Sequence, residues 1–199
     1  RSTLFPYTTL FRSPDKVVST VASDLNEFIY GQQINLSGIF TLSDKQPIAS
    51  LPVHVEVKTP SDLNWREVTQ LITGIDGKVT LPIYLGQNQS IRLRSDGTWD
   101  RLEGISNEQT IKVKPQIKIS APISSSANTK VIISGKVTPG KSVPVILERF
   151  DGKWIQVGSS ITDELGVYSF NYAISSAPFV TLRVSSLGSS SATVTIAIR

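Results

Sequence analysis

An internal repeat constrains the fold of this chain more than any other feature of its sequence. Trp65 and Trp154 are each followed by a valine after 3 residues, an isoleucine after 7, a threonine after 8, a glycine after 12 and a leucine after 28. Agreement at five positions indicates two copies of one structural unit. Upstream of the tryptophans the first copy has eight additional residues. We expect them in two surface loops, Ser43–Ser50 and Thr59–Asn64, where insertions are tolerated.

Both copies consist of short segments in which apolar and polar residues alternate. Residues 53–57 and 180–184 show this pattern clearly, and it is typical of strands with one buried face. Turn signals such as Asp76-Gly77 and Asp151-Gly152 separate the segments, and no window shows a sustained helical period. The sequence therefore predicts an all-β fold of two tandem immunoglobulin-like β-sandwiches with about seven strands each.

The predicted domains meet close to Pro115. Residues 111–114 resemble a last strand and residues 117–119 a first strand, with almost no linker between them. We therefore assign residues 17–115 to the first sandwich and residues 116–199 to the second. So short a junction favours a rod over a flexible tether.

Residues 1–16 are predicted to be non-native or disordered. The first thirteen residues, RSTLFPYTTLFRS, resemble the in-frame translation of a sequencing adapter, and such a segment is not expected to contribute to the fold. The alternative is a genuine edge strand, because the segment is rich in aromatic and branched residues. Without an initial Met or a signal peptide, the chain is expected to be a fragment of a longer protein from a metagenomic assembly.

The composition excludes several classes of function. Cysteine is absent, so disulfides and thiolate sites are excluded. The net charge of +4 is spread along the chain, whereas nucleic-acid binding requires a concentrated basic face. No apolar run approaches the length of about 20 residues that a membrane-spanning helix requires. We therefore expect no nucleic-acid partner and no membrane span.

The sequence offers little catalytic or metal-binding chemistry. The single histidine, His54, lies at an outward strand position, where we expect a solvated imidazole without a hydrolytic triad. The candidate calcium ligands are Asp96, Asp100 and Glu103 in one loop, and Asp163 with Glu164 in another. Aspartate before glycine is explained more simply as a turn residue. We predict no catalytic residue, no metal site, no cofactor and no enzymatic activity.

Three tryptophans and one arginine are the candidate contact residues. Strict alternation places Trp65 and Trp154 on the outer face of a sheet and Val68 on the inner face, unless a bulge intervenes. Trp99 lies in a predicted loop beside Arg101, in the first copy only. A loop tryptophan flanked by charges is typical of a contact residue. The alternative for Trp99 is an indole folded back over its own hydrophobic edge.

Residues 131–184 resemble the tandem immunoglobulin-like repeat modules of bacterial secreted and cell-wall-associated proteins. The similarity rests on a strand ending in Ser-Gly, a Val-x-Val strand, a Trp strand, a Thr-x-x-x-Gly turn before an aromatic strand, and a Leu-Arg pair. It implies an extracellular or cell-surface location and a non-catalytic role as a structural or adhesive spacer. Neighbouring domains of the parent chain would then be its partners. The alternative function is a carbohydrate- or cell-wall-binding accessory module, whose partner would be cell-wall polysaccharide or another surface protein.

Overall fold

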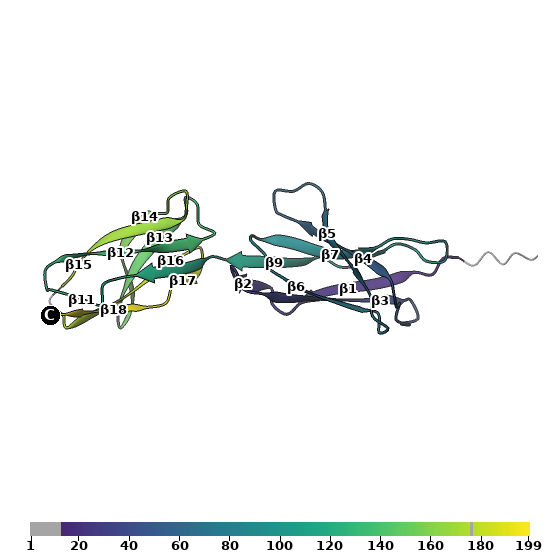
Figure 1. Cartoon of the computed structure of the whole chain (residues 1–199), viewed down its shortest axis with the longest axis horizontal. Coiled ribbons are helices and arrows are strands. Elements are labelled where there is room, and N and C mark those ends of the chain that lie inside the picture. Colours follow the sequence, from purple (N-terminus) through teal and green to yellow (C-terminus); the bar gives the residue numbers. More distant parts are fainter. Residues whose placement is uncertain (1–12, 176) are drawn as a thin grey trace, which may run out of the picture. The chain divides into compact units, whose positions relative to one another are not determined.

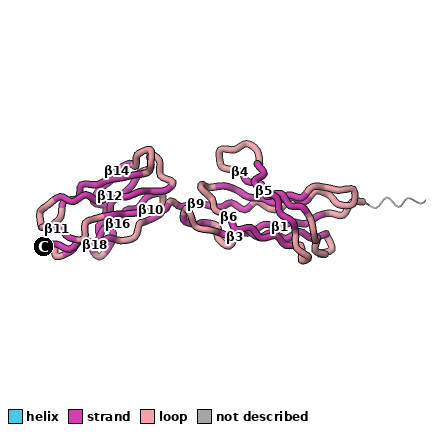
Figure 2. The backbone as a smooth tube through the Cα atoms, in the orientation of Figure 1, coloured by secondary structure: helices cyan, strands magenta, loops and turns pink. Residues whose placement is uncertain are grey.

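The computed structural model describes residues 13–175 and 177–199, which form strands, turns and loops without a helix (Figures 1 and 2). The predicted all-β fold is confirmed. Residues 1–12 of the adapter-like segment lie outside the described residues. The chain divides into two compact units, one holding residues up to 26, 34–83 and 89–111, the other 27–33, 84–88 and 112–199. The boundary predicted between residues 115 and 116 stays a prediction.

The first half of the chain forms a three-stranded and a six-stranded sheet, whose strands other than β8 are labelled in Figure 1. The smaller sheet has the order β1 (Val17–Ser23), β3 (Ile34–Leu42), β6 (Lys78–Ile83). The larger sheet has the order β2 (Glu27–Ile29), β9 (Gln109–Lys114), β7 (Gln89–Ser95), β4 (Pro52–Lys58), β5 (Arg66–Ile72), and β8 (Gly104–Ile105) also pairs with β7.

The second half repeats this topology strand for strand. Its smaller sheet has the order β10 (Gln116–Ser120), β12 (Lys130–Thr138), β15 (Val167–Ala173). Its larger sheet has the order β11 (Ser124–Ser125), β18 (Val194–Ile198), β16 (Phe179–Ser186), β13 (Pro144–Asp151), β14 (Lys153–Ile161), and β17 (Ser189–Ser190) also pairs with β16. Among the described residues, seven strands in each half have five residues or more, which agrees with the predicted number.

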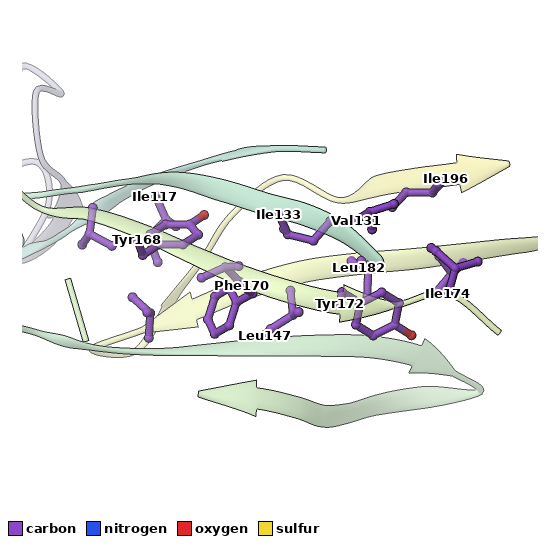
Figure 3. Close-up of a cluster of buried hydrophobic side chains, with 14 residues drawn as sticks. Ile117, Val131, Ile133, Leu147, Tyr168, Phe170, Tyr172, Ile174, Leu182 and Ile196 are labelled. Carbon is purple, nitrogen blue, oxygen red and sulfur yellow. The ribbon is translucent and has the colours of Figure 1, made fainter. Parts of the chain in front are cut away.

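The core of each sandwich is formed by the inward-facing residues of its two sheets. In the second sandwich Ile133 from the smaller sheet and Leu147, Leu182 and Ile196 from the larger sheet are almost fully buried (Figure 3). Alternation along β15 buries Tyr168, Phe170 and Tyr172 against the same cluster. Removal of this apolar surface from water is the main driving force for folding.

The eight additional residues of the first copy are accommodated in the two loops expected. The loop between β3 and β4 covers residues 43–51, whereas its counterpart in the second sandwich covers residues 139–143. The loop between β4 and β5 covers residues 59–65, whereas the equivalent hairpin turns at Gly152 alone.

A β-bulge interrupts the same hairpin in both sandwiches. Val55 pairs with Thr69 while Glu56 pairs with Glu67, so that Val68 is the extra residue. Val157 occupies the equivalent place between β13 and β14. The prediction that Val68 faces inward is wrong, because the bulge turns its side chain outward and leaves it 44% exposed.

The strand register also corrects the alignment of the two copies. Glu56 lies opposite Arg92 and Glu148 lies opposite Arg183. Arg92, and not Arg94, is therefore the structural equivalent of Arg183. The shared spacing of 28 residues matched two leucines whose structural positions differ by two residues. The mismatch was hidden because positions two residues apart lie on the same face of a strand.

In each sandwich a short early strand pairs in parallel with the last strand. Residues 27–29 of β2 pair with residues 112–114 of β9, and residues 124–125 of β11 pair with residues 197–198 of β18. The other strand pairings are antiparallel among the strands that the structure describes. At one edge of each larger sheet, a strand from the early part of the module thus lies beside the module's last strand.

Substitution of Gly135 tests the packing of the smaller sheet in the second sandwich. A Cβ atom at this position would overlap the carbonyl oxygen of Lys118 and the ring of Tyr168, whose hydroxyl donates to that same oxygen over 2.7 Å. We expect Gly135→Ala to lower the free energy of unfolding by about 3 kcal/mol, measured by chemical denaturation. Gly86→Ala is the control, because its Cβ would meet nothing closer than 4.0 Å. Equal stabilities of the two variants would contradict this account.

Candidate functional site

The outer face of the larger sheet carries a cluster of tryptophan, arginine and glutamate in both sandwiches. In the first, the guanidinium of Arg92 lies 4.4 Å from the centre of the Trp65 ring. Arg92 Nε donates a hydrogen bond of 2.7 Å to Glu56 Oε2. The three residues come from β7, the residue before β5, and β4, so that the cluster links adjacent strands. We call this arrangement the Trp–Arg–Glu cluster.

The second sandwich repeats the Trp–Arg–Glu cluster with nearly the same geometry. The guanidinium of Arg183 lies 4.1 Å from the centre of the Trp154 ring, and Arg183 Nε donates to Glu148 Oε2 over 2.7 Å. Phe150 adds a tilted aromatic contact, with 5.2 Å between its ring centre and that of Trp154. Trp154 and Trp65 are both half-buried, and cation–π contact with arginine occupies a face of each indole.

Charge pairing in the first sandwich extends beyond the cluster. Glu56 is bound by two arginines, since Arg94 Nε donates to its second oxygen over 2.9 Å. Burial by itself would raise the pKa of Glu56, but the hydrogen bonds from Arg94 and Arg92 outweigh it and hold the pKa below the ordinary value. Glu56 is therefore a carboxylate whose charge stabilises the folded sheet.

His54 lies at the centre of this face and is only 9% exposed. Its Nδ1 lies 2.9 Å from Glu67 Oε2 on β5, and its Nε2 lies 3.0 Å from Asp96 Oδ2 beyond β7. The expectation of a solvated imidazole is wrong, although the side chain does point outward. Long polar side chains from both neighbouring strands cover an outward position on a central strand.

The carboxylates considered as calcium ligands bind protein groups. Asp96 and Glu103 both pair with Arg94, the latter over 3.6 Å. Hydrogen bonds from Arg94 and then from His54 hold the pKa of Asp96 below its ordinary value. Asp163 accepts two backbone N–H groups in its turn. Within the described residues no group of three or more histidine, cysteine, aspartate or glutamate side chains could hold a metal ion.

Trp99 differs from the other two tryptophans because its side chain is 90% exposed. The interpretation of an indole folded back over a hydrophobic edge is therefore wrong. The loop that carries it is nonetheless ordered by hydrogen bonds. Thr98 N donates to Arg101 O over 2.8 Å. Asp15 fixes the loop from outside, donating to Asp100 O over 2.8 Å and accepting from Leu102 N over 2.9 Å.

The structure does not gather the four candidate contact residues into one site. Trp65 and Trp154 belong to separate sandwiches, and Trp99 lies in the loop between β7 and β8. Arg101 is in the same loop, with its Nε 3.7 Å from Asp100 Oδ1 and its side chain mostly covered. Sequence reasoning missed the partners of the repeated tryptophans, Arg92, Arg183 and the two glutamates. Their signal was a charged residue at an outward position of each Val-rich central strand.

Comparison with known proteins finds no matching protein-family model and no matching curated protein. Similar solved structures include the D0-D1 domain of intimin, at 15% identity and a TM-score of 0.35, covering 90% of this chain and 96% of that one. A protein of the DUF4785 family from Legionella pneumophila is 10% identical with a TM-score of 0.43, covering 84% and 52%. The alpha-2-macroglobulin of E. coli is 8% identical with a TM-score of 0.42, covering 95% and 17%.

The described part of the chain contains no helix of the length and hydropathy that crossing a membrane requires. No catalytic family is shown by the comparisons.

Acid sensitivity tests the role of Glu56. Because its folded-state pKa is depressed, its contribution to stability is complete above the ordinary value of 4.5 and is lost as the pH falls below it. We expect Glu56→Gln to reduce stability by about 2 kcal/mol at pH 7 and to make the first sandwich less sensitive to acid, measured by denaturant titration at pH 7 and pH 3. Glu164→Gln, at an exposed turn, is the control. An acid response unchanged by Glu56→Gln would refute this role.

Proposed function

We propose that the chain is a non-catalytic pair of structural or adhesive modules that spaces a functional domain within a larger bacterial extracellular protein. The observation that carries this proposal is the parallel pairing between an early strand and the last strand of each sandwich. Neighbouring domains of the parent chain are the partners that this role requires.

Parallel pairing at the ends of a module determines how it responds to tension. When force enters through the N-terminal side and leaves through the C-terminal side, two parallel strands are pulled in opposite directions along their length. Their hydrogen bonds are then sheared together, whereas an antiparallel pair pulled from one end opens one bond at a time. In the second sandwich these bonds include Ala197 N to Ile123 O (2.9 Å) and Arg199 N to Ser125 O (3.0 Å).

The equivalent pair in the first sandwich has an additional ionic contact. Tyr30 N donates to Lys114 O over 2.8 Å, and the Lys114 ammonium lies 2.5 Å from a Glu27 carboxylate oxygen. Both modules thus connect their early and last strands directly. This is the property that a spacer under load between a surface and a functional domain needs.

The chemistry of the outer faces supports a non-catalytic role. The single histidine is enclosed by Glu67 and Asp96, so the most versatile acid–base group of the chain already has partners on both ring nitrogens. The repeated tryptophans are likewise occupied by arginine. The Trp–Arg–Glu cluster that both modules share links neighbouring strands of the larger sheet.

A carbohydrate-binding accessory module is the second candidate function. It is supported by the exposed indole of Trp99, because a flat aromatic face can stack on a sugar ring. Retention of the chain on insoluble polysaccharide or purified cell wall, with loss of retention in Trp99→Ala, would favour this candidate over a pure spacer.

Single-molecule pulling between the two termini tests the spacer role. We expect two separate unfolding events, the one with the larger gain in contour length belonging to the first module, which has more residues. Ser125→Pro should lower the force of the second module's event, because proline cannot donate to a ladder and disrupts the short strand β11. The first module in the same molecule serves as the internal control. Gradual extension without distinct events would contradict the proposal.

A further inference from the structure

Trp99 differs from the other two tryptophans in its surroundings within the described part of the chain. Among the described residues, guanidinium groups lie over the rings of Trp65 and Trp154, each bound in turn by a glutamate. No guanidinium of the described residues 13–175 and 177–199 is placed over the ring of Trp99 in this way, and Trp99 is 90% exposed. Two tryptophans of this chain therefore pair with arginine, and the third presents an exposed indole.

The loop around Trp99 supplies the negative charge that the clusters obtain from glutamate. Its acidic residues are Asp96, Asp100 and Glu103, all with partly exposed side chains, against Arg101 as the only base in residues 96–103. Arg94, which pairs with Asp96 and Glu103, adds one positive charge beside the loop. With two arginines against three carboxylates, residues 94–103 keep a net charge of −1, whereas the chain as a whole carries +4. An incoming cation would meet an electron-rich ring face beside carboxylates.

The loop is held in place before any partner arrives. Asp15 binds its backbone on both sides of Arg101, and Asp96 is fixed by Arg94 and by the buried His54. An exposed indole on an ordered loop loses little conformational entropy on binding, which favours affinity. The second sandwich has no such loop, since a two-residue turn at Leu187-Gly188 connects β16 to β17.

We propose that Trp99 receives an arginine side chain from a partner protein, which completes on this loop the Trp–Arg–carboxylate arrangement that each module forms internally. The inference rests on the proposed adhesive role and names its partner as a protein with an exposed, basic arginine-bearing segment. Arginine is favoured over lysine because its planar guanidinium stacks on aromatic faces. A neutral sugar can donate hydroxyl hydrogen bonds to these carboxylates, but it lacks the charge attraction that a guanidinium adds.

The test is titration of the isotopically labelled 199-residue chain with a hexa-arginine peptide, followed through the indole N–H signals of the three tryptophans in NMR spectra. We expect the Trp99 signal to shift selectively, and Trp99→Ala to weaken binding by about tenfold. Asp100→Asn should weaken it by about threefold, and hexa-lysine should bind less tightly than hexa-arginine. Leu63→Ala, which removes an equally exposed apolar side chain from another loop, and Asp62→Asn are the matched controls and should bind like the parent.

Two results would overturn the inference. Equal affinity of the parent and Trp99→Ala would show that hexa-arginine binds through charge alone. Retention on polysaccharide that depends on Trp99 and is not displaced by hexa-arginine would assign the loop to a sugar. Because pulling experiments measure the spacer role separately, failure of the arginine contact would leave that proposal intact, and failure of the spacer role would be seen without any ligand.

Discussion

One extra residue in β5 and in β14 determines which side chains meet on the solvent-facing side of each larger sheet. Val68 and Val157 are inserted at the same point of equivalent hairpins. The bulge that each forms absorbs the extra residue, so that the residues before and after it stay paired with the neighbouring strand. The tryptophan three positions earlier then lies over an arginine of the strand two places away. Ionic and cation–π contacts of this kind are individually modest. Here they connect three adjacent strands at a site that is covered by an aromatic ring.

The two modules differ in the side chains that surround the shared Trp–Arg–Glu cluster. The first has added a second arginine, a buried histidine and three carboxylates, which together hold the loop that carries Trp99. The second has kept the simpler cluster and added an aromatic neighbour, Phe150. The extra groups of the first module therefore hold an exposed loop, whereas the extra aromatic ring of the second packs against its own tryptophan.

Periodicity was sufficient to predict the fold because alternation of side chains reports directly on which face of a strand is buried. It identified all-β sandwiches with about seven strands each, and the likeness of the two copies. It could not predict the outward position of Val68, because a bulge changes the parity of a strand without changing its composition. It also failed for His54, whose burial is produced by Glu67 and Asp96, residues distant in sequence that only the strand register brings together. The equivalence of Arg92 with Arg183 was hidden for the same reason.

The bulged strands β5 and β14 are also the outermost strands of their sheets. Each leaves apolar side chains in water, among them Val68 and Ile72 in one and Val157 and Ile161 in the other. A straight strand of this kind invites edge-to-edge pairing with a neighbouring molecule, whereas a bulge bends and twists the edge so that a second strand cannot align with it. The residue that positions the tryptophan thus also interrupts the regular edge that a strand of a neighbouring molecule would need for pairing.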